Sequence, residues 1–548
     1  MLAVCLAVLG AVQLAAFTGF QTGTASAQQA EASPDYQSWS KVAGRAENAL
    51  SDRRASVSAL EQLRADLVGW RTVFLSAQDI NQSRIATLQN QISALGPEPA
   101  DGSSEPEALA ARRAELGALL IELSSPGLRA QEARSRASGL IRELDALVRQ
   151  RQTARLFELG PTPLNPTIWP DAFGDAGASW TLAAGEVKMG WQSVTQQKLF
   201  RGSLPVTVIY LLVAFVLLLR GRYWMVNLTQ KVQAAPVGSL ARVYGLGVSL
   251  GQVVLPVLGI YAFVQAANST GFAGLRGQII IDALPSLGLA FFGARWLSLR
   301  LFPKISYAHS FLQVTPETGA VARRYGAAAG LIWGVERPLA QLAEFDGYSA
   351  ASQAVLHFVL ILAAGFVLYK LGRVLRACAC FVPPAGDAAA PGEPDADDAA
   401  HARSLRARAL DLIGRALILV AAAASLVAAV GYVSAAQAVV YPTIQSLGLL
   451  ALLLVASALA REIYAAIAAR DDGGRDALIP WTVTLFLVLG AVPLFALIWG
   501  ARGSDLAEIW GRFTEGVQLG DARVSPTDFL TFAIVFVVGY LATRLLQS

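Results

Sequence analysis

The sequence predicts an all-α polytopic membrane protein that carries an N-terminal periplasmic helical domain with coiled-coil character. Hydrophobic residues make up 54% of the 548 residues and charged residues only 15%, whereas soluble domains carry about 25% charged residues. After residue 200, apolar runs long enough to cross a bilayer recur along the chain. Before residue 200, apolar side chains follow helical spacing among many charged ones.

The first 27 residues, 1–27, are predicted to be a secretory signal peptide. The apolar run Leu2–Phe17 is followed by Ala25-Ser26-Ala27, the small-x-small pattern that signal peptidase accepts. Gln28 is therefore the expected mature start. No Lys or Arg precedes the apolar run, which leaves open an upstream start codon or a retained anchor.

Residues 28–200 are predicted to form a periplasmic domain of long antiparallel helices. The first apolar stripe repeats every three or four residues, as in a coiled coil, and consists of Leu60, Leu63, Leu67, Trp70 and Phe74. Helix breaks are expected at Gly96-Pro97 and near Pro126-Gly127, because proline lacks the backbone amide hydrogen. The aromatic segment 173–191 is expected near the lipid headgroups.

No catalytic or metal-binding pattern is recognisable in the sequence. It contains no nucleophile elbow, paired metal ligands or phosphate-binding loop, so we expect neither an enzyme nor a cofactor. Cys378 and Cys380 are one residue apart, which is too close for a typical zinc site. The net charge of +4 is attributed to basic cytoplasmic loops rather than to nucleic-acid binding.

Nine membrane spans are predicted within residues 201–548, because a spanning helix needs about 20 mostly apolar residues. The segments are 203–220, 242–266, 279–299, 324–343, 352–370, 408–432, 440–460, 479–499 and 527–545. The fourth segment is the weakest, since it contains Glu336-Arg337-Pro338.

Basic residues mark alternate ends of these segments, as the positive-inside rule requires. The odd-numbered segments end near Arg220, Arg300, Lys370, Arg461 and Arg544. The turns Asn268–Thr270, Asp346–Tyr348 and Ser434–Gln437 contain no Lys or Arg. This alternation works only if the fourth segment crosses. It predicts a bacterial inner-membrane protein with a flexible, Pro-, Ala- and Asp-rich cytoplasmic linker at 377–403.

Two sets of residues are candidates for a role inside the membrane. The first set is glycines with four-residue spacing, which allow helices to approach closely: Gly247, Gly251, Gly326, Gly330 and Gly334. Static packing is the expected role of these glycines, and a sliding or gating contact is the alternative. The second set is ionisable residues at membrane depth: Arg295, Glu336, Arg337, Asp411 and Arg415.

The positions of these ionisable residues indicate a structural role. Most lie near helix ends, where long side chains reach the membrane surface, whereas a transport pathway would place charges at the midplane. Glu336 and Arg337 are adjacent, so on a helix they point in different directions and are not expected to pair. Asp411 and Arg415 are four residues apart, a spacing that permits an intrahelical ion pair.

Four motifs occur in a recognisable order. They are Trp70-Arg71, Leu95-Gly96-Pro97-x-Pro99, Pro163-Leu164-x-Pro166-x-x-Trp169, and Val524-Ser525-Pro526-Thr527-Asp528-Phe529-Leu530 leading into the apolar segment 533–546. With this layout the chain resembles the N-terminal two thirds of large members of the small-conductance mechanosensitive channel superfamily. Those members have a signal peptide and a helical periplasmic domain.

This resemblance implies a homoheptamer that opens in the lipid bilayer when membrane tension rises in hypo-osmotic shock. The helices between residues 203 and 499 would be lipid-facing paddles that transmit tension. In that superfamily a Gly/Ala-rich pore helix and a β-rich cytoplasmic vestibule follow, and neither is present in this sequence. We therefore expect a truncated or split chain that does not conduct on its own.

Two other functions stay open. A secondary transporter would show internal repeats and broken helices with convergent polar groups at the membrane midplane. A non-conducting envelope scaffold would use residues 28–200 to bind a cell-wall or protein partner.

Overall fold

The computed structural model describes most of the chain. The described residues are 34–52, 54–78, 80–96, 106–233, 239–303, 315–380, 396–467, 478–515, 517–519 and 522–524, with Phe532 and Val535. The predicted signal peptide, much of the predicted linker and all of the ninth predicted span except Phe532 and Val535 lie outside them. The chain divides into two compact units, Met1–Thr153 and Ala154–Ser548, whereas the sequence predicted a boundary at residue 200. Each unit is described by itself.

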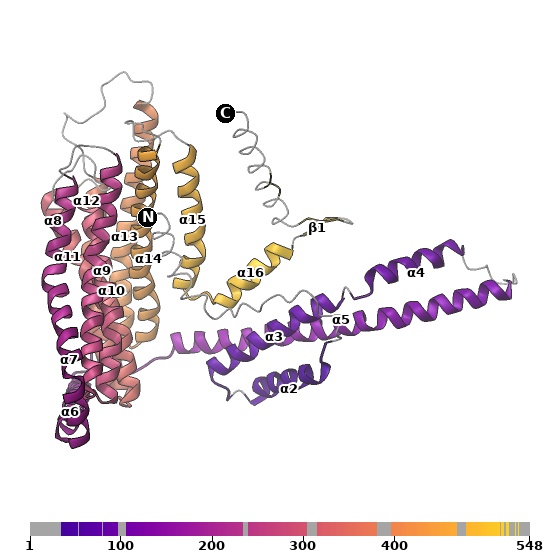
Figure 1. The fold of residues 1–548 in the computed structure, drawn as a ribbon, viewed down its shortest axis with the longest axis horizontal. Coiled ribbons are helices and arrows are strands. Elements are labelled where there is room, and N and C mark those ends of the chain that lie inside the picture. Colours follow the sequence, from indigo (N-terminus) through magenta and orange to yellow (C-terminus); the bar gives the residue numbers. More distant parts are fainter. Residues whose placement is uncertain are drawn as a thin grey trace. The chain divides into compact units, whose positions relative to one another are not determined.

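The N-terminal unit is helical in all its described parts (Figure 1). Its helices are α2 (Tyr36–Asp52), α3 (Val57–Gln78), α4 (Gln82–Ala94) and α5 (Glu107–Leu156). Asp35 caps α2, because its Oδ1 atom accepts hydrogen bonds from the amides of Gln37 at 3.0 Å and Ser38 at 3.1 Å. The hydrogen bonds from Ser38 hold the pKa of the Asp35 carboxyl below its usual value.

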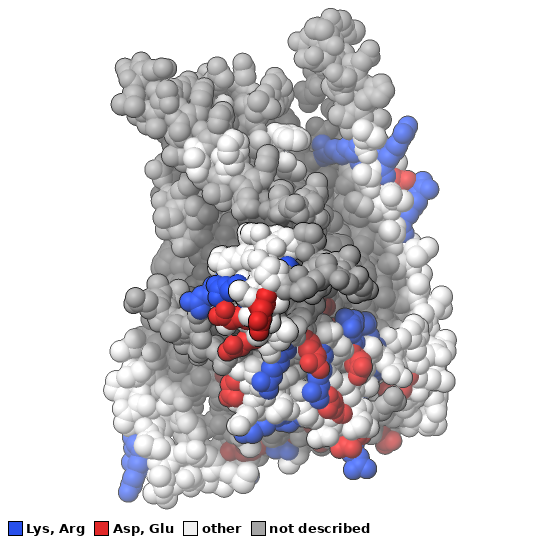
Figure 2. Space-filling view, turned by 90° about the vertical axis from the view of Figure 1, so that its right-hand side faces the viewer, with Lys and Arg blue, Asp and Glu red and all other residues white. Residues whose placement is uncertain are grey.

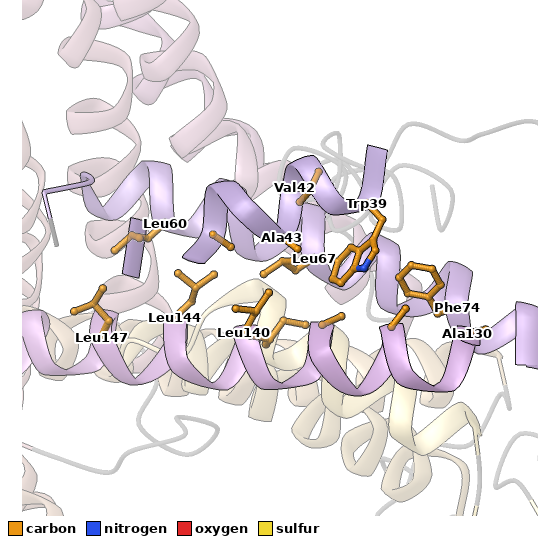
Figure 3. Packing of buried hydrophobic residues seen from close by; sticks show 14 of the residues in the cluster. Trp39, Val42, Ala43, Leu60, Leu67, Phe74, Ala130, Leu140, Leu144 and Leu147 are labelled. Atoms are coloured by element: carbon orange, nitrogen blue, oxygen red, sulfur yellow. The ribbon is translucent and has the colours of Figure 1, made fainter. Parts of the chain in front are cut away.

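The core of this unit lies between α3 and α5, with α2 packed on α3 (Figure 3). The predicted stripe on α3 is confirmed in part, since Leu60, Leu67 and Phe74 are fully buried while Leu63 and Trp70 are only partly buried. Trp39 of α2 meets the Phe74 ring edge-on, with the ring centroids 5.2 Å apart. Apolar side chains at alternating three- and four-residue spacing therefore hold the unit together.

The predicted helix break near Pro126-Gly127 is wrong, because α5 runs unbroken through both residues. Proline costs its helix one hydrogen bond and crowds the preceding turn, yet tertiary contacts compensate here. Gly127 passes close to the end of α3, where a Cβ atom would lie 3.3 Å from the Gln78 carbonyl oxygen. The Asn81 side chain donates a hydrogen bond to the Leu123 carbonyl at 3.5 Å.

A buried ion pair joins α3 to α5, and it was not predicted from the sequence. Arg64 follows Leu60 by four residues, so it lies on the core face, and its side chain is 4% exposed. Its Nε atom donates to Asp145 Oδ1 at 2.7 Å. In the central part of the face drawn in Figure 2, acidic and basic side chains are interspersed.

The second unit contains the membrane helices. In chain order, all the described helical segments of this unit are η1 (Pro166–Ile168), α6 (Trp169–Gln192), α7 (Val194–Val216), η2 (Leu217–Gly221), α8 (Arg222–Gln233), α9 (Ser239–Thr270), α10 (Leu275–Leu301), α11 (Pro316–Phe345), α12 (Ala350–Ala379), α13 (Ala396–Val430), α14 (Val433–Ile467), α15 (Leu478–Ile498) and α16 (Gly503–Glu515). A short antiparallel hairpin follows, in which β1 (Val517–Leu519) pairs with β2 (Ala522–Val524). Among the described residues, this hairpin is the departure from the predicted all-helical class.

Seven described helices are long and apolar enough to cross a membrane. They are Val194–Gly221, Gly247–Thr270, Leu275–Leu301, Ala350–Ala379, Leu405–Val430, Val433–Tyr464 and Trp481–Ile498. Each corresponds to one predicted span, so the chain is a membrane protein of the predicted helical class. The fourth predicted span forms part of α11, which is a continuous helix but is too polar to meet the same criterion.

Helix α11 lies antiparallel to α10 along most of its length. Near the start of α11, Arg323 Nη1 donates to the Phe302 carbonyl, directly after α10, at 2.9 Å. Asp346, directly after α11, pairs with Arg276 in the first turn of α10. The two helices therefore cover the same depth, and the turns that precede α10 and α12 lie at one end of the bundle.

We expect Asp145→Ala to destabilise the N-terminal unit by up to roughly 3–5 kcal/mol, because it removes a carboxylate that is paired with a buried guanidinium. Hydrogen exchange of the α3 amides in the full chain would measure this loss of protection. Asp66→Ala is the matched control, because Asp66 Oδ2 lies 4.0 Å from Arg45 Nη2 in an exposed ion pair. Exposed pairs of this kind contribute about 1 kcal/mol or less to stability. Equal effects of the two substitutions would contradict a special role for the buried pair.

Candidate functional site

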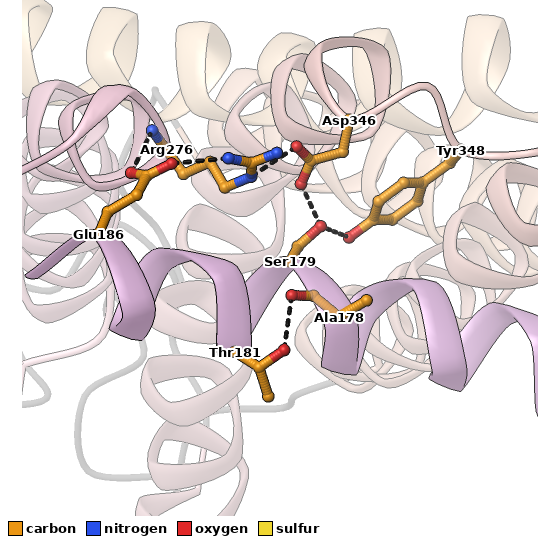
Figure 4. Close-up of polar contacts among 7 residues, drawn as sticks. All are labelled: Ala178, Ser179, Thr181, Glu186, Arg276, Asp346 and Tyr348. Atoms are coloured by element: carbon orange, nitrogen blue, oxygen red, sulfur yellow. Dashed lines mark hydrogen bonds and ion pairs between the residues drawn. The ribbon is translucent and has the colours of Figure 1, made fainter. Parts of the chain in front are cut away.

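The main polar network of the membrane unit lies where α6 meets the ends of the bundle helices (Figure 4). We call it the α6 clamp, and it consists of Ser179, Glu186, Arg276, Asp346 and Tyr348. Arg276 donates from Nη1 to Glu186 Oε1 at 2.6 Å and from Nε to Asp346 Oδ1 at 2.7 Å. Tyr348 donates its hydroxyl hydrogen to Ser179 Oγ at 2.7 Å, and Ser179 in turn donates to Asp346 Oδ2.

Helix α6 presents the clamp residues from one face. Ala172, Ser179, Glu186 and Gly190 are spaced seven, seven and four residues apart, so they share a side of the helix. Ala172, Ser179 and Gly190 are buried, and Glu186 has a side chain only 17% exposed. Helix α6 therefore packs on the bundle through small residues, and the Glu186 carboxylate makes its ion pair with the bundle.

The first turn of α10 receives that carboxylate. The backbone amide of Arg276 donates to Glu186 Oε2 at 3.3 Å, at a helix N-terminus that favours negative charge. A Cβ atom on Gly274 would lie 2.7 Å from Glu186 Cβ, so the close seat of Glu186 requires glycine there.

The turn between α11 and α12 supplies the other half of the clamp. Asp346 is the C-cap of α11, and Gly347 takes a left-handed φ of 66° that turns the chain toward Tyr348. The Asp346 side chain is 6% exposed. One guanidinium thus lies between two carboxylates with little access to water, where charge interactions are stronger than on an open surface. Loss of Arg276 would leave the two carboxylates facing each other.

The segment before α6 is also fixed to the bundle. The Gly160 amide donates to the Gly431 carbonyl at 3.2 Å, and Thr162 Oγ1 donates to the Val430 carbonyl at 3.1 Å. Gly431 has a φ of 122°, and a Cβ atom there would lie 2.7 Å from the Gly160 carbonyl oxygen. Residues 160–192 therefore contact the turns on both sides of the α12–α13 pair.

A flank of α6 next to its packed face carries exposed aromatic side chains. Phe173, Trp180 and Trp191 are 60%, 71% and 56% exposed. Such rings are typical of the membrane–water interface, where an apolar body and a polar edge are both accommodated.

Four of the five predicted packing glycines lie at helix contacts. Gly326, Gly330 and Gly334 all face α10, against Ser298, Ala294 and Leu287 respectively. A Cβ atom on Gly334 would lie 3.2 Å from Leu287 Cα, so the two backbones nearly touch. Gly251 faces Met225 of α8, and Gly247 is partly buried in α9.

The predicted ionisable residues do not converge on one site. Asp411 and Arg415 form the expected i,i+4 pair at 2.6 Å, and Arg376 joins them from α12 at 3.2 Å, which the sequence did not indicate. Glu336 is partly buried, whereas Arg337 is exposed. Arg295 is partly buried in α10.

The clamp itself was not predicted. Its residues are 70 to 169 positions apart in the pairs that bond, so local periodicity cannot reveal them. The sequence feature that pointed toward the clamp is the turn Asp346–Tyr348. Its lack of Lys and Arg indicates the side of the membrane on which it lies, and not its ion pair with Arg276. Within the described ranges no three His, Cys, Asp or Glu side chains gather to hold a metal ion.

Comparison with known proteins gives one match. A family described as a protein of unknown function (DUF3772) matches residues 127–187. This stretch includes the α5 residues that face α3 and two clamp residues, Ser179 and Glu186. No curated protein and no solved structure matches the chain.

We expect Arg276→Gln to release α6 from the bundle at a cost of about 2 kcal/mol or more, because two carboxylates lose their shared cation. Hydrogen exchange of the α6 amides in detergent-solubilised protein should rise by about 30-fold for 2 kcal/mol. Adding Asp346→Asn should recover part of the loss by removing one stranded charge. Lys188→Gln, an exposed change on the same helix, is the control, and unchanged α6 protection in Arg276→Gln would refute the clamp.

Proposed function

We propose that this chain is the tension-sensing membrane portion of a mechanosensitive channel in a bacterial inner membrane. The observation that carries the proposal is the α6 clamp. It ties a helix with an exposed aromatic flank to the ends of α10, α11 and α12. A helix at headgroup depth responds directly to changes in lipid packing, and the ion pairs on its adjacent, packed face would pass its displacement to the bundle.

Two outer helices supply the lipid contact that such a sensor needs. Leu212 and Phe215 of α7 are 58% and 64% exposed, and Phe486 and Leu489 of α15 are 71% and 55% exposed. Apolar side chains this exposed would face acyl chains. Tension does work on in-plane area, so it favours any state in which such peripheral helices spread. A homoheptamer assembled around a pore would convert that spreading into opening.

The orientation we propose places the α6 end of the bundle, and the N-terminal unit, in the periplasm. The turns after α9, α11 and α13 contact residues 160–203 at this end, as in the pairs Gly271–Gln196, Asp346–Ser179 and Gly431–Gly160. None of these turns contains Lys or Arg, which agrees with the positive-inside rule.

We further propose that α11 is a membrane span. It has 30 residues, a length of about 45 Å against roughly 30 Å of hydrocarbon. It lies beside α10 from end to end, through the Gly326, Gly330 and Gly334 contacts. Glu336 of α11 is partly buried, so neighbouring helices would lower the cost of placing this carboxyl in the membrane. Composition alone does not register such shelter, and by that measure α11 therefore ranks below its neighbours.

Secondary transport is a second candidate, and one observation favours it. Tyr441 of α14 is buried, its hydroxyl has no hydrogen-bond partner among described residues, and Glu336 is close enough to act on it electrostatically. A transporter would also need broken helices around such a site. Helices α11 and α14, which carry these two residues, are continuous. We therefore rank tension sensing first.

The crossing of α11 is tested by labelling cysteines near its two ends. Glu317→Cys and Glu344→Cys are both exposed positions on α11, about 40 Å apart along the helix. In a background with the native cysteines changed to serine, an impermeant maleimide added to spheroplasts should label Glu344→Cys only. Glu317→Cys should react only after permeabilisation. Equal labelling of both positions from one side would show that α11 does not cross.

Tension sensing is tested by distances between spin labels in liposomes. Labels at Leu212→Cys on α7 and Phe486→Cys on α15 should move apart when lysolipid added to one leaflet raises tension. Labels at Phe366→Cys on α12 and Leu419→Cys on α13 are the control, because Gly372 and Gly414 lock these helices together. Constant distances for both pairs in stretched liposomes would overturn the proposal.

A further inference from the structure

A groove on the lipid-facing side of the α12–α13 pair has the chemistry of a phospholipid site. It has a volume of about 480 Å³ and is lined by Arg376, Arg415, Ile418, Leu419, Ala422, Ala423 and Leu426. This volume lies within the roughly 300–1,000 Å³ of small-molecule sites. Apart from the two arginines, every lining side chain is aliphatic.

The polar end of the groove is a cluster with excess positive charge. Asp411 accepts from Arg415 Nη2 at 2.6 Å and from Arg376 Nε at 3.2 Å. Two guanidiniums therefore share one carboxylate, and each keeps further N–H groups for a second anion. The Arg376 and Arg415 side chains are 49% and 68% exposed, so an anion can reach them. Guanidinium groups bind phosphate well because their N–H groups form a planar fork.

The apolar part of the groove fits one acyl chain. Arg415 and Leu426 are eleven residues apart, which is about 16 Å along a helix. One leaflet of the hydrocarbon core is about 15 Å deep. Leu419 and Leu426 are both 69% exposed and form a ridge, while Ala422 and Ala423 leave the hollow between them.

The groove exists because α12 and α13 approach closely next to it. A Cβ atom on Gly372 would lie 2.7 Å from the Gly414 carbonyl oxygen. The Arg376 side chain lies across Gly414, where a Cβ atom would be 2.6 Å from Arg376 Cγ. The glycine pair thus sets the position of one of the two guanidiniums.

We propose that this groove binds an anionic phospholipid, with its phosphate on Arg376 and Arg415 and one acyl chain along Ile418–Leu426. Free phosphate would leave the aliphatic wall uncovered. A second protein chain would need an acidic group at the depth of the two arginines. Anionic lipids carry their phosphates at that depth all along the leaflet. The proposal requires only that α12 and α13 span the membrane, and it does not depend on tension sensing.

Native mass spectrometry of the full chain in a non-ionic detergent tests the proposal, with phosphatidylglycerol and phosphatidylcholine of identical acyl chains as probes. The wild type should retain phosphatidylglycerol preferentially. Each arginine near a membrane surface contributes a factor of about five. Arg376→Gln with Arg415→Gln should therefore lower the preference roughly 25-fold. Lys188→Gln with Arg201→Gln, exposed changes of equal charge in α6 and α7, should leave it unchanged.

Two further variants separate lipid binding from folding. Asp411→Asn removes the competing carboxylate and should raise phosphatidylglycerol affinity by about fivefold, even if it lowers thermal stability. Ala422→Trp fills the hollow without altering charge and should abolish the preference. The proposal would be overturned if Asp411→Asn showed no gain in phosphatidylglycerol affinity. It would also be overturned if Ala422→Trp kept its lipid but lost a protein partner in the same spectra. The latter result would identify the groove as a contact between copies of this chain.

Discussion

The membrane unit depends on close helix contacts made without a hydrophobic drive. Lipid tails are as apolar as leucine, so helices gain little by hiding apolar side chains from them. The remaining attraction between helices is dispersion between complementary surfaces. Small residues allow the backbones to approach closely enough for this attraction to act. Gly330 and Gly334 achieve this between α10 and α11, and Gly372 and Gly414 between α12 and α13. These helix pairs are therefore places of close backbone approach in the bundle.

Polar contacts lie at the ends of these closely packed pairs. The α6 clamp joins the α10–α11 pair to α12 through the turn that follows α11. Its ion pairs have little access to water, since the Glu186 and Asp346 side chains are 17% and 6% exposed, and charge interactions are stronger there than on an open surface. Packing and charge therefore stabilise different parts of the bundle. The interior of the bundle is held by shape, and its end surface is held by ion pairs and hydrogen bonds.

Local patterns in the sequence predicted the elements well and their long-range contacts poorly. The burial of Leu60, Leu67 and Phe74 follows from spacing, and the seven apolar helices follow from length and composition. The continuity of α5 through Pro126 did not follow, because the intrinsic preference of proline is against a helix interior and the helix is continuous there all the same. The pairs Arg64–Asp145 and Arg276–Glu186 join residues 81 and 90 positions apart, and no helical period reaches that far.

The contact between Gly160 and Gly431 links two stretches of chain that are otherwise remote. Each glycine leaves space for the carbonyl of the other, and Gly431 also needs a backbone angle that side chains resist. A methyl group at Gly431 would strike Gly160, and moving that segment would also shift Thr162 from its hydrogen bond to Val430. In related sequences, substitutions at these two positions should therefore occur together, so that covariation between them would trace where the link before α6 meets the bundle.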